Sequence, residues 1–285
     1  MLAQDITIII ITYNSENVIE NCINAFPQEV RVLVLDNGSS DRTVALAKRH
    51  PSVEVIQNQN IGYGRAANIG FSKVATPYAL LLNPDVKMDM ASLQAMLDCI
   101  KLHPNIGILG ARTFHHEQGA KIYQKSFAFN KDGLCHVEWI VGALMLFRMD
   151  AVRKVGQFDE HIFLFFEETE FCRRFVMEGF KLAICKQAEA EHVWGTSSTQ
   201  TMRTTKIRAW HSAWSRAYYY RKHFGRSRFV KKSLSKFFKN IFNIIKYFLL
   251  MRRQKVIINA YEIMGLMAFV IGMEAFDANG KARIT

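Results

Sequence analysis

Short apolar runs alternate with helical stretches along the first hundred residues of the chain. The apolar runs are rich in Val, Ile and Leu and lie at 6–11, 30–36, 53–56 and 78–83. Helix candidates lie between them, at 17–26, 42–50 and 64–74. Strands of this kind, separated by helices, are typical of a parallel sheet with both faces covered. The pattern therefore predicts an α/β fold.

The rest of the chain shows a change of character near residue 220. Before it, an apolar strand candidate at 137–147 precedes helix candidates at 150–156 and 168–179, and Gly179 is a suitable helix end. Beyond it, long basic and apolar helical patterns follow, and no repeat of fixed period appears. We predict a globular domain at 1–220 and a basic helical region at 221–285.

Polar side chains stand directly after several of the predicted strands. Ligands of α/β proteins bind at the carboxyl ends of the strands, near the point where the strand order reverses. An ordinary strand-to-helix turn explains part of the pattern equally well, since Asp41 can cap the helix that follows. The binding-site candidates at the strand ends are Thr12, Asn14, Asp36, Asn37, Asn83 and Asp85.

The Asn83-Pro84-Asp85 turn carries two side-chain oxygen ligands at the end of a strand. Hard oxygen ligands suit Mg²⁺ or Mn²⁺ held jointly with a diphosphate. An ordinary Asn-Pro turn explains the same residues. His192 would add a nitrogen ligand if the chain returned to Asp85, although a single His is more often structural.

The run "IGYGRAAN" at 61–68 contains G-x-G-x-x-A at the start of a helix candidate. With Asp85 placed 21 residues after Gly64, the run resembles the dinucleotide fingerprint of a nicotinamide-dependent oxidoreductase. The match is weak, because "QNQN" separates the glycines from the preceding strand. A glycine-rich loop that brings the backbone close to a nucleotide sugar explains the same residues.

The stretch "FFEETEFCRR" at 165–174 places three carboxylates in four positions. A helix start accounts for Glu170, because acids in the first turn complement the helix dipole and can pair one turn on. It accounts less well for Glu167 and Glu168, which follow a wholly apolar run. A carboxylate at the mouth of an apolar pocket can have its pKa raised into the range of a general base.

Charge and cysteine usage narrow the classes of protein. The net charge is +12, yet residues 201–285 alone hold 18 Lys and Arg against three acids, so the basic character lies in the tail. Such a tail binds phosphate, on lipid or nucleic acid. Five scattered cysteines without a C-x-x-C pair indicate reduced thiols. No signal-peptide pattern begins the chain, so we expect a cytoplasmic protein.

Seven motifs together resemble glycosyltransferase family 2, and most closely its bacterial rhamnosyltransferase-type branch. They cover roughly residues 5–200 in the order and approximate spacing of the family, and seven ordered motifs are far more specific than one. They read "TIIIITYNSE", "VLDNGSSD", "NQNIGYGRAANIG", "LLLNPDV", "VGALMLFRMDAVRKVGQFDE", "FFEETEFCRR" and "EHVWGTSS".

The resemblance implies a GT-A fold, Rossmann-like with a mainly parallel sheet flanked by helices, over 1–220. It implies an inverting transfer of a sugar, rhamnose being one candidate, from a dTDP- or UDP-linked donor to a saccharide or polyprenyl-diphosphate-linked acceptor in surface polysaccharide synthesis. Asp85 and His192 would hold Mg²⁺ or Mn²⁺. The implied nucleotide-sugar residues are Thr12, Tyr13, Asn14, Glu16, Asp36, Gly62, Arg65, Asn68, Asn83 and Gly142.

The resemblance places Glu168 where the general base of the family stands. The family usually has Asp at this position, so Glu168 extends the carboxylate by one methylene, and Glu167 beside it could exchange roles. Likewise, Asn83-Pro84-Asp85 stands where many relatives have D-x-D. In an inverting transfer a cation at the diphosphate and a carboxylate on the acceptor side are both required.

The basic region contains an amphipathic pattern at 231–253. Its apolar residues recur at three- and four-residue steps, with lysines on the other face. This pattern is typical of a helix lying on an anionic membrane surface. A helix packed on the body of the protein is the alternative, which the basic residues at both ends favour less. The later run "IMGLMAFVIGM" is too short to span a bilayer. We therefore expect a peripheral protein at the cytoplasmic face of the inner membrane.

Two other classes of function remain open from the residues alone. One is the nicotinamide-dependent oxidoreductase built on Gly62 and Gly64. The other is a non-catalytic protein whose tail binds lipid or nucleic acid. One-sided clustering of the aromatic residues in the tail favours lipid, because nucleic-acid sites interleave aromatic and basic residues. We therefore expect no nucleic-acid partner.

Overall fold

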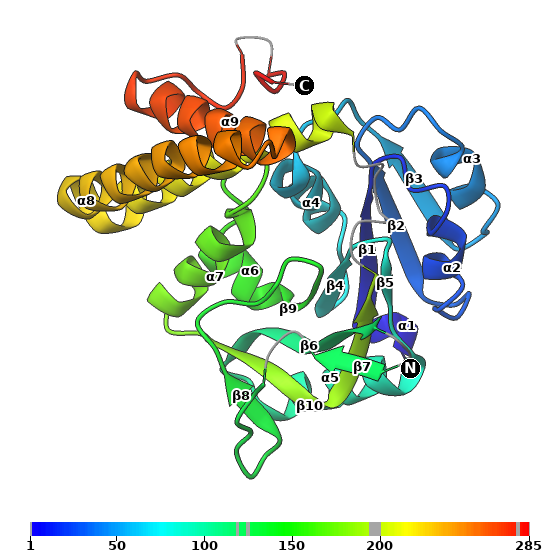
Figure 1. Ribbon diagram of the computed structural model, residues 1–285. Coiled ribbons are helices and arrows are strands. Elements are labelled where there is room, and N and C mark those ends of the chain that lie inside the picture. Colours follow the sequence, from blue (N-terminus) through cyan, green and yellow to red (C-terminus); the bar gives the residue numbers. More distant parts are fainter. Residues whose placement is uncertain (1, 118–119, 124–125, 194–200, 278–279, 285) are drawn as a thin grey trace. The chain divides into compact units, whose positions relative to one another are not determined.

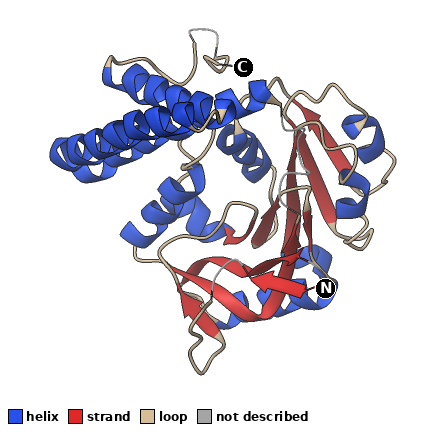
Figure 2. Cartoon of the chain, viewed as in Figure 1, coloured by secondary structure: helices blue, strands red, loops and turns tan. Residues whose placement is uncertain are grey.

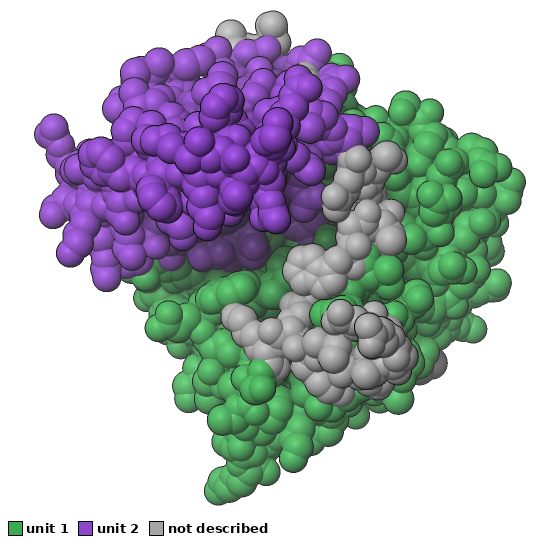
Figure 3. Space-filling model, in the orientation of Figure 1, with its two compact units in different colours: residues 1–60, 66–158, 171–198 green, residues 61–65, 159–170, 199–285 purple. Residues whose placement is uncertain are grey.

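The computed structural model describes residues 2–117, 120–123, 126–193, 201–277 and 280–284 (Figure 1). The chain forms two compact units, coloured separately in Figure 3. The first unit comprises residues 1–60, 66–158 and 171–198, and the second comprises 61–65, 159–170 and 199–285. The predicted division into 1–220 and 221–285 stays a prediction, because the compact units follow the fold rather than the order of the chain.

Four parallel strands form the first half of the sheet, in the order β3-β2-β1-β4 (Figures 1 and 2). The apolar runs predicted as strands become these strands, which confirms the parallel α/β arrangement for this half. The register pairs Thr12 with Asp36, so the polar ends of two strands meet at one edge. The strands are β1 (Ile6–Thr12), β2 (Arg31–Asp36), β3 (Val53–Gln57) and β4 (Tyr78–Leu82).

The second half of the sheet is mixed rather than parallel. β9 pairs antiparallel with both β4 and β6, β10 runs parallel to β6, and β5 pairs antiparallel with β10. β7 and β8 attach to β6 and β10 at the side of this path. These strands are β5 (Val86–Lys87), β6 (Ile106–Glu117), β7 (Ala120–Tyr123), β8 (Leu134–His136), β9 (Leu144–Arg148) and β10 (Lys181–His192).

The strand predicted at 137–147 is wrong in its first part, since only β9 at 144–148 is a strand. The residues before β9 form no strand of their own, and the two ends of this segment bond to β10 and to the turn after β4. Val137 N donates to Leu182 O, and Ala143 O accepts from Asn83 N. Residues 137–143 are therefore a loop fixed at both ends.

Helices cover the sheet. The predicted helices form within a few residues of their expected bounds, whereas α1 and α5 were not predicted. Asp89 caps α5 by accepting from Ser92 N at 2.7 Å. Gly179, with φ +86°, follows α7, and Gly179 N and Phe180 N bond back to Val176 O and Phe175 O, which closes the helix as expected. The helices are α1 (Leu2–Asp5), α2 (Ile19–Ile23), α3 (Thr43–Ala47), α4 (Tyr63–Ser72), α5 (Met90–Leu102), α6 (Met149–Val155) and α7 (Glu167–Met177).

The second unit is built on two long helices, α8 (Met202–Leu249) and α9 (Arg253–Val270), which lie side by side (Figure 1). A Cβ on Gly265 of α9 would lie 2.1 Å from Trp210 O of α8, so only glycine allows this close packing. Gly225, with φ +74° and ψ −178°, interrupts the helical geometry of α8. Among the described helices, none is both long and apolar enough to cross a membrane.

Candidate active site

The turns that follow β1 and β2 are joined through the carboxylate of Asp36. This side chain is 1% exposed, and both of its oxygens accept hydrogen bonds. Thr12 Oγ1 donates at 3.1 Å, Gly38 N and Ser39 N donate at 3.1 and 3.0 Å, and the Ser39 hydroxyl donates as well. Asp36 therefore fixes the shape of the loop at the carboxyl end of the sheet.

Asn14 and Glu16 extend this link between the two turns. Asn14, with φ +53°, donates from its N to Ser39 Oγ at 2.8 Å, and its Oδ1 accepts from Ser40 N at 2.8 Å. Glu16 Oε2 accepts from Arg42 N and Nε at 3.2 and 3.0 Å. The structure thus brings Thr12, Asn14, Glu16 and Asp36 together, with the neighbouring Tyr13 exposed.

Asp41 also belongs to this cluster, a position that the sequence indicated only as a helix cap. Its oxygens accept from Thr43 N at 3.0 Å and from Glu16 N at 3.1 Å. Burial opposes ionisation, but the hydrogen bonds from Thr43 and Glu16 outweigh it and hold the pKa of Asp41 below its usual value. Asp41 therefore stays ionised and ties the first loop to the start of α3.

Asp85 and His192 meet although 106 residues separate them in the sequence. Val86 pairs with His192 between β5 and β10, and Val193 N donates to Asp85 O at 3.1 Å. His192 Nε2 then lies 3.5 Å from Asp85 Oδ1, and both side chains are buried. The remainder of the motif that follows, residues 194–198, lies outside the described residues.

Asp85 Oδ1 is buried and accepts no hydrogen bond from the described part of the chain. A buried carboxylate oxygen without a donor is costly unless a cation or proton satisfies it. An oxygen and an imidazole nitrogen suit Mg²⁺ or Mn²⁺. No cluster of three or more His, Cys, Asp or Glu ligands occurs among the residues described, so the diphosphate and water would supply the other ligands. The donor set fits the predicted metal ion.

The Asn83 turn and the Gly142 loop lie next to each other in the first unit. Asn83 N donates to Ala143 O at 2.9 Å, which holds the 141–143 loop against the turn that carries Asp85. Asn83 and Gly142, two more of the predicted nucleotide-sugar residues, are thereby held at the turn that carries Asp85.

Asn68, Arg65 and Gly62 make structural contacts that the sequence did not reveal. Asn68 bonds the backbone of Phe158 through both Oδ1 and Nδ2, at 2.8 and 3.0 Å, inside the first unit. In the second unit, Arg65 Nε donates to Glu160 O at 2.8 Å. A Cβ on Gly62 would lie 2.5 Å from Phe163 O. Their predicted contacts with a nucleotide sugar remain predictions.

The G-x-G-x-x-A run opens α4 only after an interval of several residues. β3 ends at Gln57, whereas α4 begins at Tyr63. A dinucleotide fingerprint requires the glycine turn directly after the strand. This geometry therefore does not support the hypothesis that Gly62 and Gly64 belong to a nicotinamide-dinucleotide site.

The carboxylate pair Glu167 and Glu168 begins α7, in the part of that helix that belongs to the second unit. Glu167 is 6% exposed, and its Oε2 is buried and has no hydrogen-bond partner in the part of the chain that the structure describes. Burial, reinforced by the adjacent Glu168, raises the pKa of Glu167 well above its usual value. Burial also raises the pKa of Glu168, which is the more exposed of the two. Raised pKa values suit a general acid or base.

The backbone before this pair is strained. Phe165 and Phe166 have φ values of +66° and +68°, a left-handed region that costs roughly 1–3 kcal/mol for each bulky residue. Contacts within the second unit hold both rings, since Arg208 lies over Phe165 at 5.6 Å and Tyr219 packs on Phe166 at 5.6 Å. Strain of this kind persists only where the surrounding structure enforces it.

Lys222 of α8 holds the segment that carries the pair. Its Nζ lies 2.6 Å from Glu170 Oε1 and 2.6 Å from Asp159 Oδ2. His223 Nε2 lies 3.1 Å from Glu170, and Tyr218 OH donates to Asp159 at 2.8 Å. Burial disfavours the charge of Asp159, but the bond from Lys222 outweighs this and lowers the pKa of Asp159. The two ends of the 159–170 segment are thus anchored to α8.

Comparison with known proteins gives the class and then the family. The fold is that of the GT-A glycosyltransferases, and it matches Staphylococcus aureus TarS 1–349 in complex with UDP, with a TM-score of 0.57, 18% identity, and coverage of 99% of this chain and 96% of that one. The model of Glycosyl transferase family 2 matches residues 7–162. The chain belongs to glycosyltransferase family 2.

Two other comparisons are with named transferases. N-acetylglucosaminyl-diphospho-decaprenol L-rhamnosyltransferase of Mycobacterium tuberculosis is 25% identical over 210 residues, which cover 59% of this chain and 68% of that protein. GalNAc-T7 with UDP, GalNAc and Mn²⁺ matches with a TM-score of 0.54 and 12% identity. That match covers 76% of this chain and about half, 49%, of the other. The resemblance to the rhamnosyltransferase-type branch is confirmed.

Replacing Lys222 by Met should destabilise the second unit. The change leaves the carboxylates of Asp159 and Glu170 buried without their shared cation, which costs about 3 kcal/mol or more of unfolding free energy at pH 7. Urea unfolding followed by tryptophan fluorescence measures this, because Trp210 and Trp214 lie in the core of the second unit.

The pH dependence of the unfolding free energy tests the same ion pair. Paired with Lys222, Asp159 has a lowered pKa, and the stability this confers is present above the pKa of the unfolded state and lost as pH falls through the folded one. The gap in unfolding free energy between wild type and Lys222→Met should therefore keep its pH 7 size down to about pH 4, near the ordinary pKa of an Asp, and narrow as the pH falls further. Lys222→Arg keeps the charge and serves as the control. Equal stability of the Met and Arg variants at pH 7 would contradict the anchoring role.

Proposed function

We propose that the chain is a metal-dependent, inverting glycosyltransferase of bacterial surface polysaccharide synthesis. Its donor would be a dTDP- or UDP-linked sugar, with rhamnose favoured by the rhamnosyltransferase relative, and its acceptor a saccharide or a polyprenyl-diphosphate-linked saccharide. The observation that carries the proposal is the unsatisfied Asp85 Oδ1 beside His192, at the sheet end where donors bind.

Different residues would act on the donor and on the acceptor. Asp85 and His192 would hold a divalent cation, which neutralises charge on the leaving diphosphate. The linked loops of Asn14 and Asp36 would position the nucleotide. Glu168 would take the proton of the acceptor hydroxyl as that oxygen attacks the anomeric carbon, so that the configuration inverts. Glu167, more deeply buried, would remain protonated beside it.

Nucleotide binding tests the metal site directly. Isothermal titration with UDP, dTDP and GDP, each with and without Mn²⁺, should show metal-dependent binding of one of them. Asp85→Ala should lose the metal-dependent part of the affinity, at least tenfold, because an anionic ligand of the cation is removed.

Asp98→Ala is the matched control, since Asp98 is an exposed acid on α5. Binding that is equally metal-dependent in Asp85→Ala would remove Asp85 from the site. Absence of binding of every nucleotide by the wild type would overturn the transferase proposal.

Glu168→Gln should abolish transfer while donor binding stays nearly intact. Loss of a general base lowers kcat by about 10² to 10⁴ fold. In the wild type, kcat/KM should fall as pH drops through the raised pKa of the carboxylate, above the about 4.3 of an ordinary Glu. Steady-state kinetics from pH 5 to pH 9 measure both effects.

Glu167→Gln serves as the comparison for the base assignment. It should keep most of the activity and leave the acidic limb near its wild-type pH, because Glu167 would already be protonated while Glu168 ionises, so the change removes no charge. If Glu167→Gln is the inactive variant and Glu168→Gln turns over, the two residues exchange roles.

We also propose that α8 attaches the protein to an anionic membrane at the cytoplasmic face. A stripe of apolar side chains, here called the α8 stripe, is exposed beyond Gly225, and Lys232, Lys239 and Lys246 are exposed on its flank. Apolar burial combined with basic residues is what binds interfacial helices to anionic lipid. The α8 stripe is Leu234 (52% exposed), Phe238 (64%), Ile241 (39%), Phe242 (66%), Ile245 (57%), Phe248 (73%) and Leu249 (75%).

Flotation with vesicles that contain phosphatidylglycerol tests this attachment in the full chain. Truncation is unsuitable, because α9 contributes Ala268 to the core that contains Trp210 and Trp214. The triple variant Phe238→Ser/Phe242→Ser/Phe248→Ser should lose most of the floated fraction. Added salt should lower the floated fraction of the wild type. Leu102→Ser/Val176→Ser/Met177→Ser, with similar exposure on the first unit, is the control. Equal flotation of both variants would exclude the α8 stripe.

A further inference from the structure

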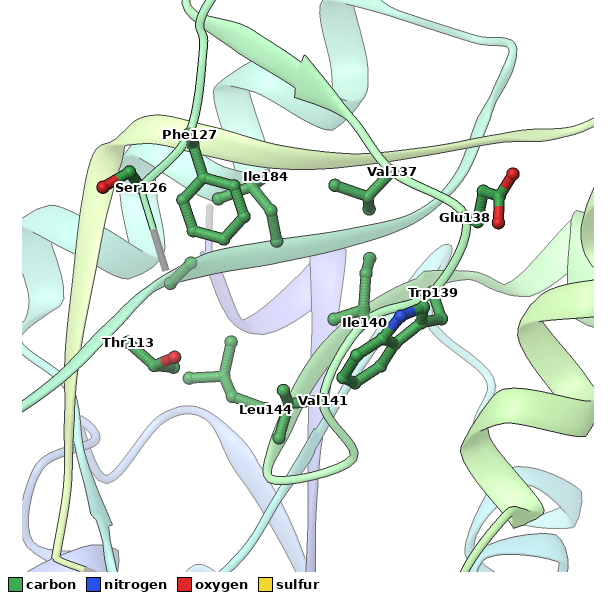
Figure 4. A pocket seen from close by; sticks show the side chains of 11 residues that line it. Thr113, Ser126, Phe127, Val137, Glu138, Trp139, Ile140, Val141, Leu144 and Ile184 are labelled. Carbon is green, nitrogen blue, oxygen red and sulfur yellow. The ribbon is translucent and has the colours of Figure 1, made fainter. Parts of the chain in front are cut away.

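A second candidate site lies in the first unit, and its described lining includes neither Asp85 nor His192. It is a cavity of about 320 Å³, at the lower end of the range of ligand sites (Figure 4). The 137–141 loop forms one wall, Phe127 another, and side chains from β6, β9 and β10 form the floor. The wall is the segment whose strand prediction failed, which left its side chains available to a cavity instead of a sheet.

The lining combines two aromatic rings with a few neutral polar groups. Figure 4 shows the Phe127 ring and the Trp139 indole with Ile184 and Ile140 between them, and the Glu138 carboxylate turned away from Phe127. Trp139 is 39% exposed, an uncommon exposure for so large an apolar surface. The hydroxyls of Thr113 and Ser126 lie on the same lining.

The described lining offers no cation to an anionic ligand. No Lys or Arg is among the described residues that line the cavity, so a phosphate or diphosphate would find no cation there. A neutral ligand with one apolar face and hydroxyls on its edge matches an aromatic platform bordered by hydroxyl groups. The C–H face of a pyranose ring packs on an aromatic ring, and its hydroxyls hydrogen-bond to side chains such as Thr and Ser.

The cavity is joined to the proposed donor site through the backbone. Its wall continues into the 141–143 loop, and Ala143 O accepts from Asn83 N at 2.9 Å, two residues before Asp85. Leu144, the next residue, again lines the cavity. A saccharide held here would therefore be close in the same unit to the turn that carries Asp85.

We propose that this cavity binds a pyranose ring of the acceptor saccharide, with Trp139 as the stacking platform and Thr113 as a hydrogen-bond partner. The proposal rests on the proposed glycosyltransferase function and names its acceptor class at this position. It places the specificity for the acceptor sugar in the 137–141 loop and Phe127.

Saturation-transfer difference NMR on the full chain tests the site. The probes are the methyl glycosides of glucose, galactose, rhamnose and N-acetylglucosamine, in the presence of saturating nucleoside diphosphate and Mn²⁺. At least one glycoside should receive saturation from the wild type. Trp139→Ala should reduce that signal at least fivefold, Thr113→Val should reduce it less, and Trp139→Phe should keep most of it.

The controls separate this proposal from the proposed function. Nucleotide titration of each variant should match the wild type, which shows that the variants fold and that the donor site is intact. If Trp139→Ala fails to fold, the signals of Thr113→Val and Trp139→Phe relative to the wild type decide whether the cavity binds the glycoside. No glycoside signal from the wild type, a signal unchanged in these variants, or displacement of the glycoside by nucleotide would each overturn the acceptor subsite. Loss of nucleotide binding by the wild type would instead overturn the donor site.

Discussion

A buried carboxylate oxygen must receive a hydrogen bond, a cation or a proton, and this constraint sorts the acids of the chain by role. Asp36 is satisfied entirely by the protein, through four hydrogen bonds. Glu170 is satisfied by Lys222 and His223. Asp85 Oδ1 and Glu167 Oε2 are buried and accept no hydrogen bond from the described residues. An unsatisfied buried polar group costs about 1–3 kcal/mol, so these two positions are the ones where a ligand or a proton has most to contribute.

The position of Asp85 depends on one short pairing. β5 has only two residues, yet its pairing with the end of β10 brings His192 to the carboxylate. The partners are supplied by segments far apart in the sequence, so the pair depends on the long-range pairing of β5 with β10. A metal ion shared by the two side chains would in turn stabilise this edge of the sheet, because binding to the folded state alone shifts the folding equilibrium.

The sequence predicted what depends on local pattern. Apolar runs identified β1 to β4, and the residues that follow them, such as Asp36 and Asp85, proved to be buried at the strand ends. The failures concern long-range contacts. Nothing near Lys222 in the sequence shows that it meets Asp159 and Glu170, and the pairing of β10 with β6 and β5 leaves no local signal. The two bonds of the Asn68 amide to the backbone of Phe158, 90 residues away, likewise leave no local signal.

The second unit explains why the carboxylate pair tolerates its conformation. Phe165 and Phe166 occupy a strained backbone region directly before Glu167, and Asp159 and Glu170 on either side are fixed by the same lysine. Without Lys222 the two buried acids would destabilise the segment, and without its contacts to α8 the strained backbone at Phe165 and Phe166 would relax. The ion pairs of Lys222 hold the 159–170 segment near both ends, so α8 sets the conformation from which Glu168 would act. The helix with the exposed apolar stripe is therefore also the one that orders the proposed base.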